Sequence, residues 1–298
     1  MKFIIIIVTG VIICGLVLLW EIVRENGFFV TRIYDVTVPG TKWNESHNIV
    51  FISDLHNHVY GKDNDILLEH IRRMEPECVL IGGDLLVAKP EKDFSVAVRF
   101  VEDLCKEYKV FYAHGNHEHR LYLYPEIYKD MAKRYKEALK HLPIHWLVNK
   151  GATIQVEDTS LHVFGIEIDK EYYKKFFHEI LSEKQVESYL GKKPEGYTVL
   201  LAHNPEYFKA YAGWGADMTL SGHVHGGIMR LPFLGGVISP SLRLFPKYDG
   251  GRKKEFGKEM IISRGLGVHT IPVRLFNPAE LVVLRLCSEK KVDINERK

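Results

Sequence analysis

Residues 48–56, with the sequence NIVFISDLH, decide the fold that this chain is expected to adopt. The first six residues form a short, mostly apolar run that is typical of a buried strand. Asp54 and His56 follow at once, and side chains two positions apart in an extended segment project to the same side. Similar runs, each ending in polar or glycine residues, recur at residues 78–81, 110–113, 197–202 and 217–220.

Helical patterns fill the gaps between these runs. Apolar residues recur at helical spacing in residues 63–74, 93–108 and 126–142. Two further strands are expected at residues 152–156 and 161–166, joined as a meander. Alternating strands and helices without an internal repeat predict one α/β domain, with a site at the carboxyl ends of its strands.

Side chains that commonly bind metal ions follow each of the five buried runs. Asp84 offers a carboxylate with two oxygens, which can bridge two cations. The candidate ligands are Asp54, His56, Asp84, Asn116, His203, His223 and His225. One such residue at a strand end is more often a cap or a surface group than a ligand. Five motifs in order, all at predicted strand ends, are far rarer by accident and predict a metal site.

These motifs resemble those of the calcineurin-like metallophosphoesterases. The resemblance is carried by Asp54-x-His56, Gly83-Asp84, Gly115-Asn116-His117-Glu118, His203 and Gly222-His223-x-His225. The glycine-rich and arginine-containing segments at 226–232, 263–267 and 272–274 are similar to those of a membrane-anchored or exported bacterial subgroup. The family resemblance implies a two-sheet β-sandwich flanked by helices in four layers.

The resemblance also implies a role for each residue of the site. Asp54, His56, Asp84 and His225 would hold one ion, and Asp84, Asn116, His203 and His223 would hold the other. His117 would bind the phosphoryl group or protonate the leaving oxygen, while a metal-bridging hydroxide attacks phosphorus. Nitrogen and oxygen ligands without a thiolate suit two divalent ions of manganese, iron or zinc.

The expected function is therefore hydrolysis of phosphodiesters or phosphomonoesters at the membrane. One alternative is a pyrophosphatase that acts on a lipid-linked or nucleotide-sugar substrate such as UDP-2,3-diacylglucosamine. The other alternative is a non-catalytic, metal-stabilised binding module. The complete set of expected ligands, together with His117, disfavours this second alternative.

An uncharged apolar run, FIIIIVTGVIICGLVLLW, occupies residues 3–20 near the start of the chain. As a helix it would span roughly 27 Å, close to the thickness of a bilayer core. A cleaved signal peptide is the alternative, but no small-x-small cleavage site follows the run. We expect a single-pass anchor at 1–22, a linker at 23–45 and the catalytic domain at 46–298. The flanking charges do not decide the orientation, and the resemblance to envelope enzymes favours an extracytoplasmic domain at the cell membrane.

Composition and the remaining segments suggest no further partner. The chain has 40 basic and 38 acidic residues and no long block of one sign, so specific nucleic-acid binding is not expected. Residues 171–190 could form a substrate lid or a membrane-surface helix, but an amphipathic helix packed on the sheet is favoured. Residues 230–254 are expected to form a long loop, either facing substrate or on the surface.

Overall fold

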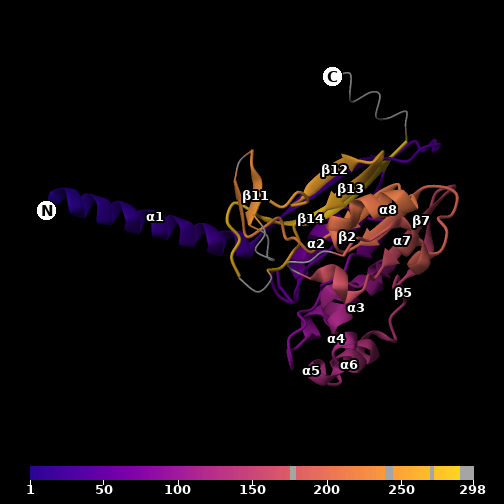
Figure 1. Cartoon of the computed structure of the whole chain (residues 1–298), viewed down its shortest axis with the longest axis horizontal. Helices are drawn as coiled ribbons and strands as arrows, with labels where there is room; N and C mark the ends of the chain where they lie inside the picture. Colours follow the sequence, from indigo (N-terminus) through magenta and orange to yellow (C-terminus); the bar gives the residue numbers. More distant parts are fainter. Residues whose placement is uncertain (175–178, 232, 239–243, 269–271, 289–298) are drawn as a thin grey trace, which may run out of the picture.

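Two six-stranded sheets carry the fold of the computed structural model (Figure 1). The structure describes residues 1–174, 179–231, 233–238, 244–268 and 272–288. The first sheet has the order β1 (Phe29–Thr37), β14 (Ala279–Cys287), β2 (His47–Ile52), β3 (Cys78–Ile81), β4 (Val110–Tyr112) and β5 (Ile144–Trp146). The second has the order β12 (Gly251–Glu255), β13 (Lys258–Ile262), β9 (Met218–Ser221), β8 (Thr198–Ala202), β7 (Thr159–Ile166) and β6 (Lys150–Val156).

The two sheets pack face to face because their central strands are apolar on both sides. In β2, Ile49 and Phe51 join the core between the sheets, whereas Val50 and Ile52 point to the opposite face. This alternation is the period of two that a pleated strand imposes. A strand with two buried faces needs a cover on each, so helices must lie on the outer face of its sheet.

Helices cover both outer faces and complete four layers. On the first sheet lie α2 (Asp65–Arg73), α3 (Ser95–Glu107), α4 (Asn116–Leu123) and α6 (Met131–Leu139), and their apolar residues share one core with β2 and β3. On the second sheet, α7 (Glu183–Leu190) and α8 (Phe208–Trp214) pack against β8. The α/β class and the two-sheet sandwich flanked by helices, both expected from the sequence, are confirmed.

The carboxyl ends of the parallel strands meet at one edge of the sandwich. In the first sheet β2, β3 and β4 run parallel, and in the second β7, β8 and β9 do so. The two edges are joined by hydrogen bonds: Nδ1 of His203, after β8, lies 2.8 Å from the carbonyl oxygen of Gly82, after β3. Side chains that follow strands of different sheets therefore share one site.

A single long helix, α1 (Lys2–Gly27), leads away from this domain (Figure 1). Its 26 residues are long and apolar enough to cross a membrane by length and composition. The helix continues past the apolar run, and β1 begins two residues after it and pairs in parallel with β14. The segment 23–45, expected to be a linker, thus contains the last turn of α1 and a strand of the first sheet.

Three other segments differ from their expected form. Residues 126–142 are not one helix, because Lys129 at φ 53° separates α5 (Pro125–Tyr128) from α6. Residues 171–190 contain the 3-10 turn η1 (Lys170–Tyr173) and, after four residues outside the described chain, α7, which begins at a capping box on Ser182. In 230–254, the described residues form most of the hairpin β10 (Met229–Leu231) and β11 (Gly235–Ile238), and then β12.

Candidate metal centre

Turns in left-handed backbone conformation present most of the candidate ligands. Asp54, His56, Asp84, His223 and His225 have φ values of 54°, 49°, 55°, 70° and 51°. The expectation that Asp54 and His56 share a side because the segment is extended is therefore wrong. The two side chains point into the site because residues 54–56 form a turn. The residues after β3 hold this turn in place: Asp54 N donates to Gly83 O and His56 N donates to Asp84 O, both at 3.0 Å. Such conformations are unfavourable for residues other than glycine and concentrate at functional sites.

Glycines next to these ligands allow the strand ends to approach one another closely. A Cβ atom added to Gly83 would lie 2.0 Å from the backbone nitrogen of Gly115. A Cβ added to Gly222 would lie 2.1 Å from Asp54 Oδ2. No other residue fits at either place without moving backbone or a ligand, so both glycines set the spacing of the site.

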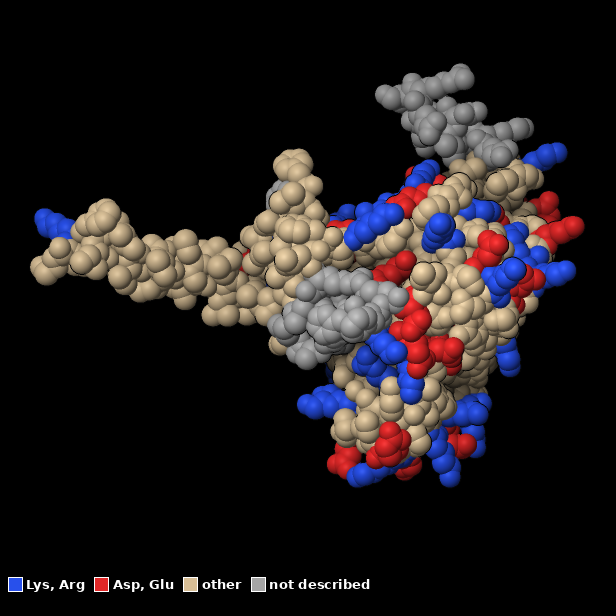
Figure 2. All heavy atoms as spheres, viewed as in Figure 1, with Lys and Arg blue, Asp and Glu red and all other residues tan. Residues whose placement is uncertain are grey.

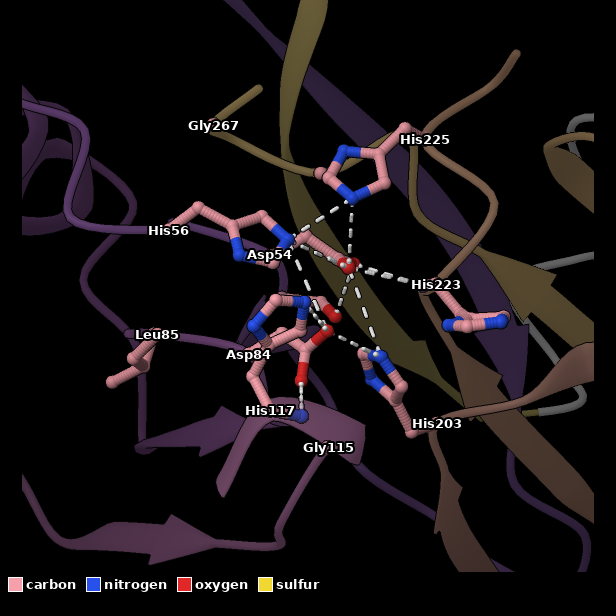
Figure 3. A network of polar contacts seen from close by, with 12 residues as sticks. Asp54, His56, Asp84, Leu85, Gly115, His117, His203, His223, His225 and Gly267 are labelled. Atoms are coloured by element: carbon pink, nitrogen blue, oxygen red, sulfur yellow. Dashed lines mark hydrogen bonds and ion pairs between the residues drawn. The ribbon is translucent and has the colours of Figure 1, made fainter. Parts of the chain in front are cut away.

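Two carboxylate oxygens lie at the centre of the site, surrounded by imidazole nitrogens (Figure 3). Asp54 Oδ1 is 3.3 Å from Nε2 of His225, 3.7 Å from that of His56 and 3.8 Å from that of His203. Asp84 Oδ2 is 3.1 Å from Nε2 of His203 and 3.9 Å from that of His56. The seven candidate ligands and His117 are all buried except His223, which is half-buried.

The two shortest separations, 3.1 and 3.3 Å, are those of atoms that share a metal ion, and the others are slightly longer. Ligand atoms about 2.0–2.2 Å from one ion lie about 3.0–3.5 Å from each other in tetrahedral or octahedral geometry. Three overlapping groups of potential ligands have their ligand atoms within 4.8 Å of one another: Asp54, His56 and His225; His56, Asp84 and His117; and Asp84, His203 and His223. The donor set of the site fits divalent cations that accept nitrogen and oxygen ligands.

Hydrogen bonds orient both carboxylates. Asp54 Oδ2 accepts from Ser53 Oγ at 2.6 Å and from the backbone nitrogen of His223 at 3.1 Å. Asp84 Oδ1 accepts from the backbone nitrogen of His117 at 2.7 Å, which leaves Oδ2 directed to the histidines. Outer hydrogen bonds of this kind keep a metal-binding carboxylate in one position.

His203 and His117 present opposite tautomers to the site. Nδ1 of His203 lies 2.8 Å from Gly82 O, an acceptor, so Nδ1 carries a proton and Nε2 can offer a lone pair to a metal. Nδ1 of His117 accepts a hydrogen bond from the backbone nitrogen of Ala88 at 2.7 Å, so its ring proton is on Nε2. A nitrogen that carries a proton cannot coordinate a metal, but it can donate to an oxygen atom. The geometry thus separates a ligand histidine from a donor histidine.

The close packing of acids and imidazoles shifts their pKa values. Burial alone would raise the pKa of Asp54, but His225 and His203 outweigh it and hold that pKa well below the usual range. Burial would lower the pKa of His203, but Asp84 and Asp54 raise it to about 10. Burial, with His203 beside it, lowers the pKa of His223 to about 3. The metal-free site therefore holds a proton on His203 where a metal ion would bind.

Asn116 is the first residue of α4, and its side-chain oxygen is a buried acceptor. Oδ1 of Asn116 has no hydrogen-bond partner among the described residues, and the residue is 4% exposed. A buried carbonyl oxygen without a donor is costly, and coordination of a cation would satisfy it. This observation supports Asn116 as a ligand, in agreement with the expectation from its motif.

Glu118 has a structural role that the sequence did not reveal. Its Oε2 accepts from the backbone nitrogens of Asp84 at 2.8 Å and Gly115 at 3.0 Å, and its Oε1 accepts from Leu85 N and Tyr112 Oη at 2.9 Å. One carboxylate therefore holds the loops after β3 and β4 together. Its position six residues after β4 was visible in the sequence, but its partners depend on the fold.

The neighbouring histidines lie outside the three groups of potential ligands. His114 Nδ1 is 2.7 Å from Glu167 Oε2, and His119 Nε2 is 3.6 Å from Glu167 Oε1. Burial lowers the pKa values of His119 and His58. His58, His114 and His119 therefore lie around the site without belonging to any of the three groups.

Comparisons with known proteins are consistent with this geometry. A family model described as calcineurin-like phosphoesterase matches residues 47–227. An uncharacterized metallophosphoesterase of Campylobacter jejuni is 28% identical over 258 residues, which cover 86% of this chain and 63% of that protein. Another, from Aquifex aeolicus, is 26% identical over 264 residues, which cover 88% and 93%. Among solved structures, the NAD nucleotidase of Haemophilus influenzae matches with a TM-score of 0.48 and 13% identity, covering 74% of this chain and 45% of that one.

Proposed function

Since the chain belongs to the calcineurin-like phosphoesterase family, we propose that it hydrolyses phosphodiesters or phosphomonoesters with two metal ions held at the described site. Members of this family use a dinuclear metal centre. The observation that carries the proposal is the approach of Asp54 Oδ1 and Asp84 Oδ2 to three histidine Nε2 atoms at 3.1–3.9 Å. The chain spans less than two thirds of the length of the Campylobacter relative. The phosphoesterase activity is therefore a proposal for this chain and is not transferred from the whole relative.

The ligands divide into two sets that share Asp84. Asp54, His56, Asp84 and His225 hold one ion, and Asp84, Asn116, His203 and His223 hold the other. The sets are supported by two of the three spatial groups and by the unsatisfied oxygen of Asn116. Manganese, iron and zinc suit these donors.

Two divalent ions held by these residues would supply positive charge for the phosphate and would lower the pKa of water bound to them. His117 directs its Nε2–H into the site, where it can donate a hydrogen bond to a phosphoryl oxygen or to the leaving oxygen. The backbone nitrogen of Ala88 fixes this tautomer. Glu118 and the glycines keep Asp84 in place. Because metal-bound water would be the attacking group, no side-chain nucleophile is required.

Metal content and turnover of Asp84→Ala test this proposal. Asp84 is the only ligand shared by both sets, so its loss should lower metal content below two ions per chain and abolish hydrolysis of bis(p-nitrophenyl) phosphate. Asp130→Ala is the control, because the Asp130 carboxylate is 64% exposed and pairs only with Arg134 among its ion pairs in the described chain. Two retained ions with unchanged turnover in Asp84→Ala would refute the assignment. Turnover of a sugar-nucleotide pyrophosphate but of neither ester class would favour the pyrophosphatase alternative.

We further propose that α1 anchors the chain in the cell membrane with the catalytic domain outside. Support comes from the length and apolar composition of α1. Long domains translocate largely regardless of the charges that flank the anchor. Protease added to intact bacterial spheroplasts should digest the domain. Protection until the membrane is opened would place the site in the cytoplasm.

A further inference from the structure

A cluster of exposed apolar side chains surrounds the β10–β11 hairpin. We define the apolar rim as Leu231, Phe233, Leu234, Leu244, Phe245 and Phe276. Phe233 and Leu244 are 107% and 67% exposed, and Phe276 is 51% exposed. Hydrophobic side chains gathered in this way on a surface mark a site of contact rather than ordinary surface composition.

Backbone contacts make the rim one unit although its residues are distant in sequence. Phe245 N donates to Val237 O of β11 at 2.9 Å. Arg230 N of β10 donates to Leu275 O at 3.0 Å, and Leu275 precedes Phe276. The hairpin, the segment after it and the segment before β14 therefore present their apolar residues together.

The rim adjoins the end of α1. Asn277, next to Phe276, donates its backbone N–H to Glu25 Oε2 at 2.6 Å, and Asn26 Nδ2 donates to Pro272 O at 2.8 Å. Trp20 and Arg24, whose guanidinium lies 5.5 Å from the Trp20 ring centroid, mark the polar boundary of the apolar helix. Glu25 is roughly 7.5 Å along the helix from Trp20, so the rim lies near the level where a bilayer would end.

Few charged side chains lie on the hairpin beside α1, and those at the end of α1 itself, Glu21, Arg24 and Glu25, are paired with one another. Figure 2 shows Lys, Arg, Asp and Glu spread over the rest of the domain, whereas the hairpin beside α1 is mostly uncharged. Within β10 and β11, Arg230 is paired with Asp249 at 2.9 Å. A surface of this kind would favour hydrocarbon and the apolar part of the interface over attraction to anionic headgroups.

The residue that links α1 to the rim also contacts a ligand loop of the site. Asn277 Nδ2 donates to His225 O at 2.7 Å and to Gly227 O at 2.6 Å. The metal site follows the carboxyl end of β2, and this end of the first sheet is also where β1 begins. Phe51, near the end of β2, pairs with Val282 of β14, and Val282 pairs with Arg32 near the start of β1. The turn at Phe256, which joins β12 to β13, lies at the opposite end of these strands from the metal site. Its neighbours Gly257 and Lys258 line a groove with Thr37 and Cys287, the last residues of β1 and β14.

We propose that the apolar rim is a second membrane contact, which inserts into the interface of the bilayer crossed by α1 and holds the metal centre against its surface. The substrate class that fits this placement is a phosphate ester on a membrane amphiphile, whose headgroup reaches the site while its chain stays in the bilayer. This inference rests on the proposed function, because it takes α1 as an anchor and the site as a phosphoesterase. The bilayer is the favoured occupant because the hydrogen bonds of Glu25 and Asn26 hold the rim beside the end of the anchor.

Depth-dependent quenching in the full chain tests the membrane contact. F233W and F256W are each placed in nanodiscs of phosphatidylcholine with brominated acyl chains, and the signal of the unsubstituted chain is subtracted. Phe256 is a matched control, since it is also an exposed phenylalanine, 49% accessible, in a hairpin turn. The added fluorescence of F233W should be quenched at least two-fold more than that of F256W. Equal quenching would overturn the proposal, and two chains per nanodisc with F233W unquenched would identify a second copy as the occupant.

Two substrates with the same scissile bond test the substrate class. The double variant Phe233→Asp, Leu234→Asp should retain activity on methyl p-nitrophenyl phosphate within two-fold and lose at least ten-fold on bilayer-embedded hexadecyl p-nitrophenyl phosphate. Phe256→Asp should change neither rate. Equal loss on both substrates, or no loss on the hexadecyl ester, would overturn the substrate assignment. If the unsubstituted chain hydrolyses neither of these esters nor the monoester p-nitrophenyl phosphate, the proposed function fails, while the quenching result still decides the membrane contact.

Discussion

Replacement of His117 should separate chemistry from metal binding. Its Nδ1 accepts the Ala88 N–H at 2.7 Å, so the ring offers a proton on Nε2, 3.9 Å from Asp84 Oδ2. His117→Ala removes this donor but leaves the backbone nitrogen that orients Asp84 Oδ1. Loss of one positioned donor typically lowers kcat by about 10²- to 10³-fold, or about 2.7–4 kcal/mol. Metal content should stay at two ions per chain.

Two amide substitutions sharpen this test. In His117→Asn the side-chain oxygen can replace Nδ1 as the acceptor for Ala88 N, but no donor remains at the position of Nε2. In His117→Gln the amide nitrogen can approach that position. The asparagine variant should therefore be as slow as His117→Ala, and the glutamine variant should recover part of the rate.

The assay combines metal analysis with steady-state hydrolysis of bis(p-nitrophenyl) phosphate under saturating metal. His141→Ala serves as the control, because the His141 side chain is 62% exposed and lies far along the chain from the ligand motifs. The reasoning is refuted if metal content falls in parallel with the rate in all three His117 variants. Such a result would make His117 a ligand and would mean that its Nε2 carries no proton when the site is loaded.

Three further outcomes follow from the structure. Asp84 and Asp54 raise the pKa of metal-free His203 to about 10, so this group is protonated at pH 7. Metal binding should therefore release about one proton from His203. Calorimetry in buffers of different ionisation enthalpy measures this proton release. The same competition should lower activity toward pH 5 and allow excess metal to restore it; a loss that metal does not reverse would indicate unfolding or a catalytic group. Glu118→Ala removes the acceptor of three buried backbone N–H groups and should reduce the free energy of unfolding by at least about 3 kcal/mol, whereas Glu69→Ala, with a half-exposed side chain, should change it by less than about 0.5 kcal/mol. The full chain should remain in membranes after carbonate extraction and require detergent, and release by carbonate would contradict an α1 anchor.

Local sequence predicted the elements whose burial is uniform. The strands at β2, β3, β8 and β9 were visible because both faces are apolar, which produces short continuous hydrophobic runs. The ligand motifs were visible because they follow those runs directly. The structure brings these side chains together at one edge, as the strand order requires.

Elements that depend on distant partners were missed. β1, with the sequence FVTRIYDVT, mixes polar and apolar residues and lies in the segment expected to be a linker. Its partner β14 lies about 250 residues later in the chain. The left-handed conformations of Asp54 and His56 were also missed, because no local propensity favours them and hydrogen bonds to Gly83 and Asp84 impose them. The contact of Glu25 with Asn277 was not foreseeable, since it joins the first helix to a loop near the end of the fold.

If α1 anchors the domain in a membrane, the buried contact of Glu25 has a consequence for release of the domain by a protease. A protease that cut α1 before Glu25 would separate the domain from its anchor and leave this carboxylate in the domain. A cut after Glu25 would also remove the acceptor of the Asn277 N–H. Because Asn277 contacts His225 O and Gly227 O, the second cut would loosen a loop that carries candidate ligands. A released form that stays competent must therefore keep Glu25, and the cleavage position would decide whether shedding yields a working or a disabled domain.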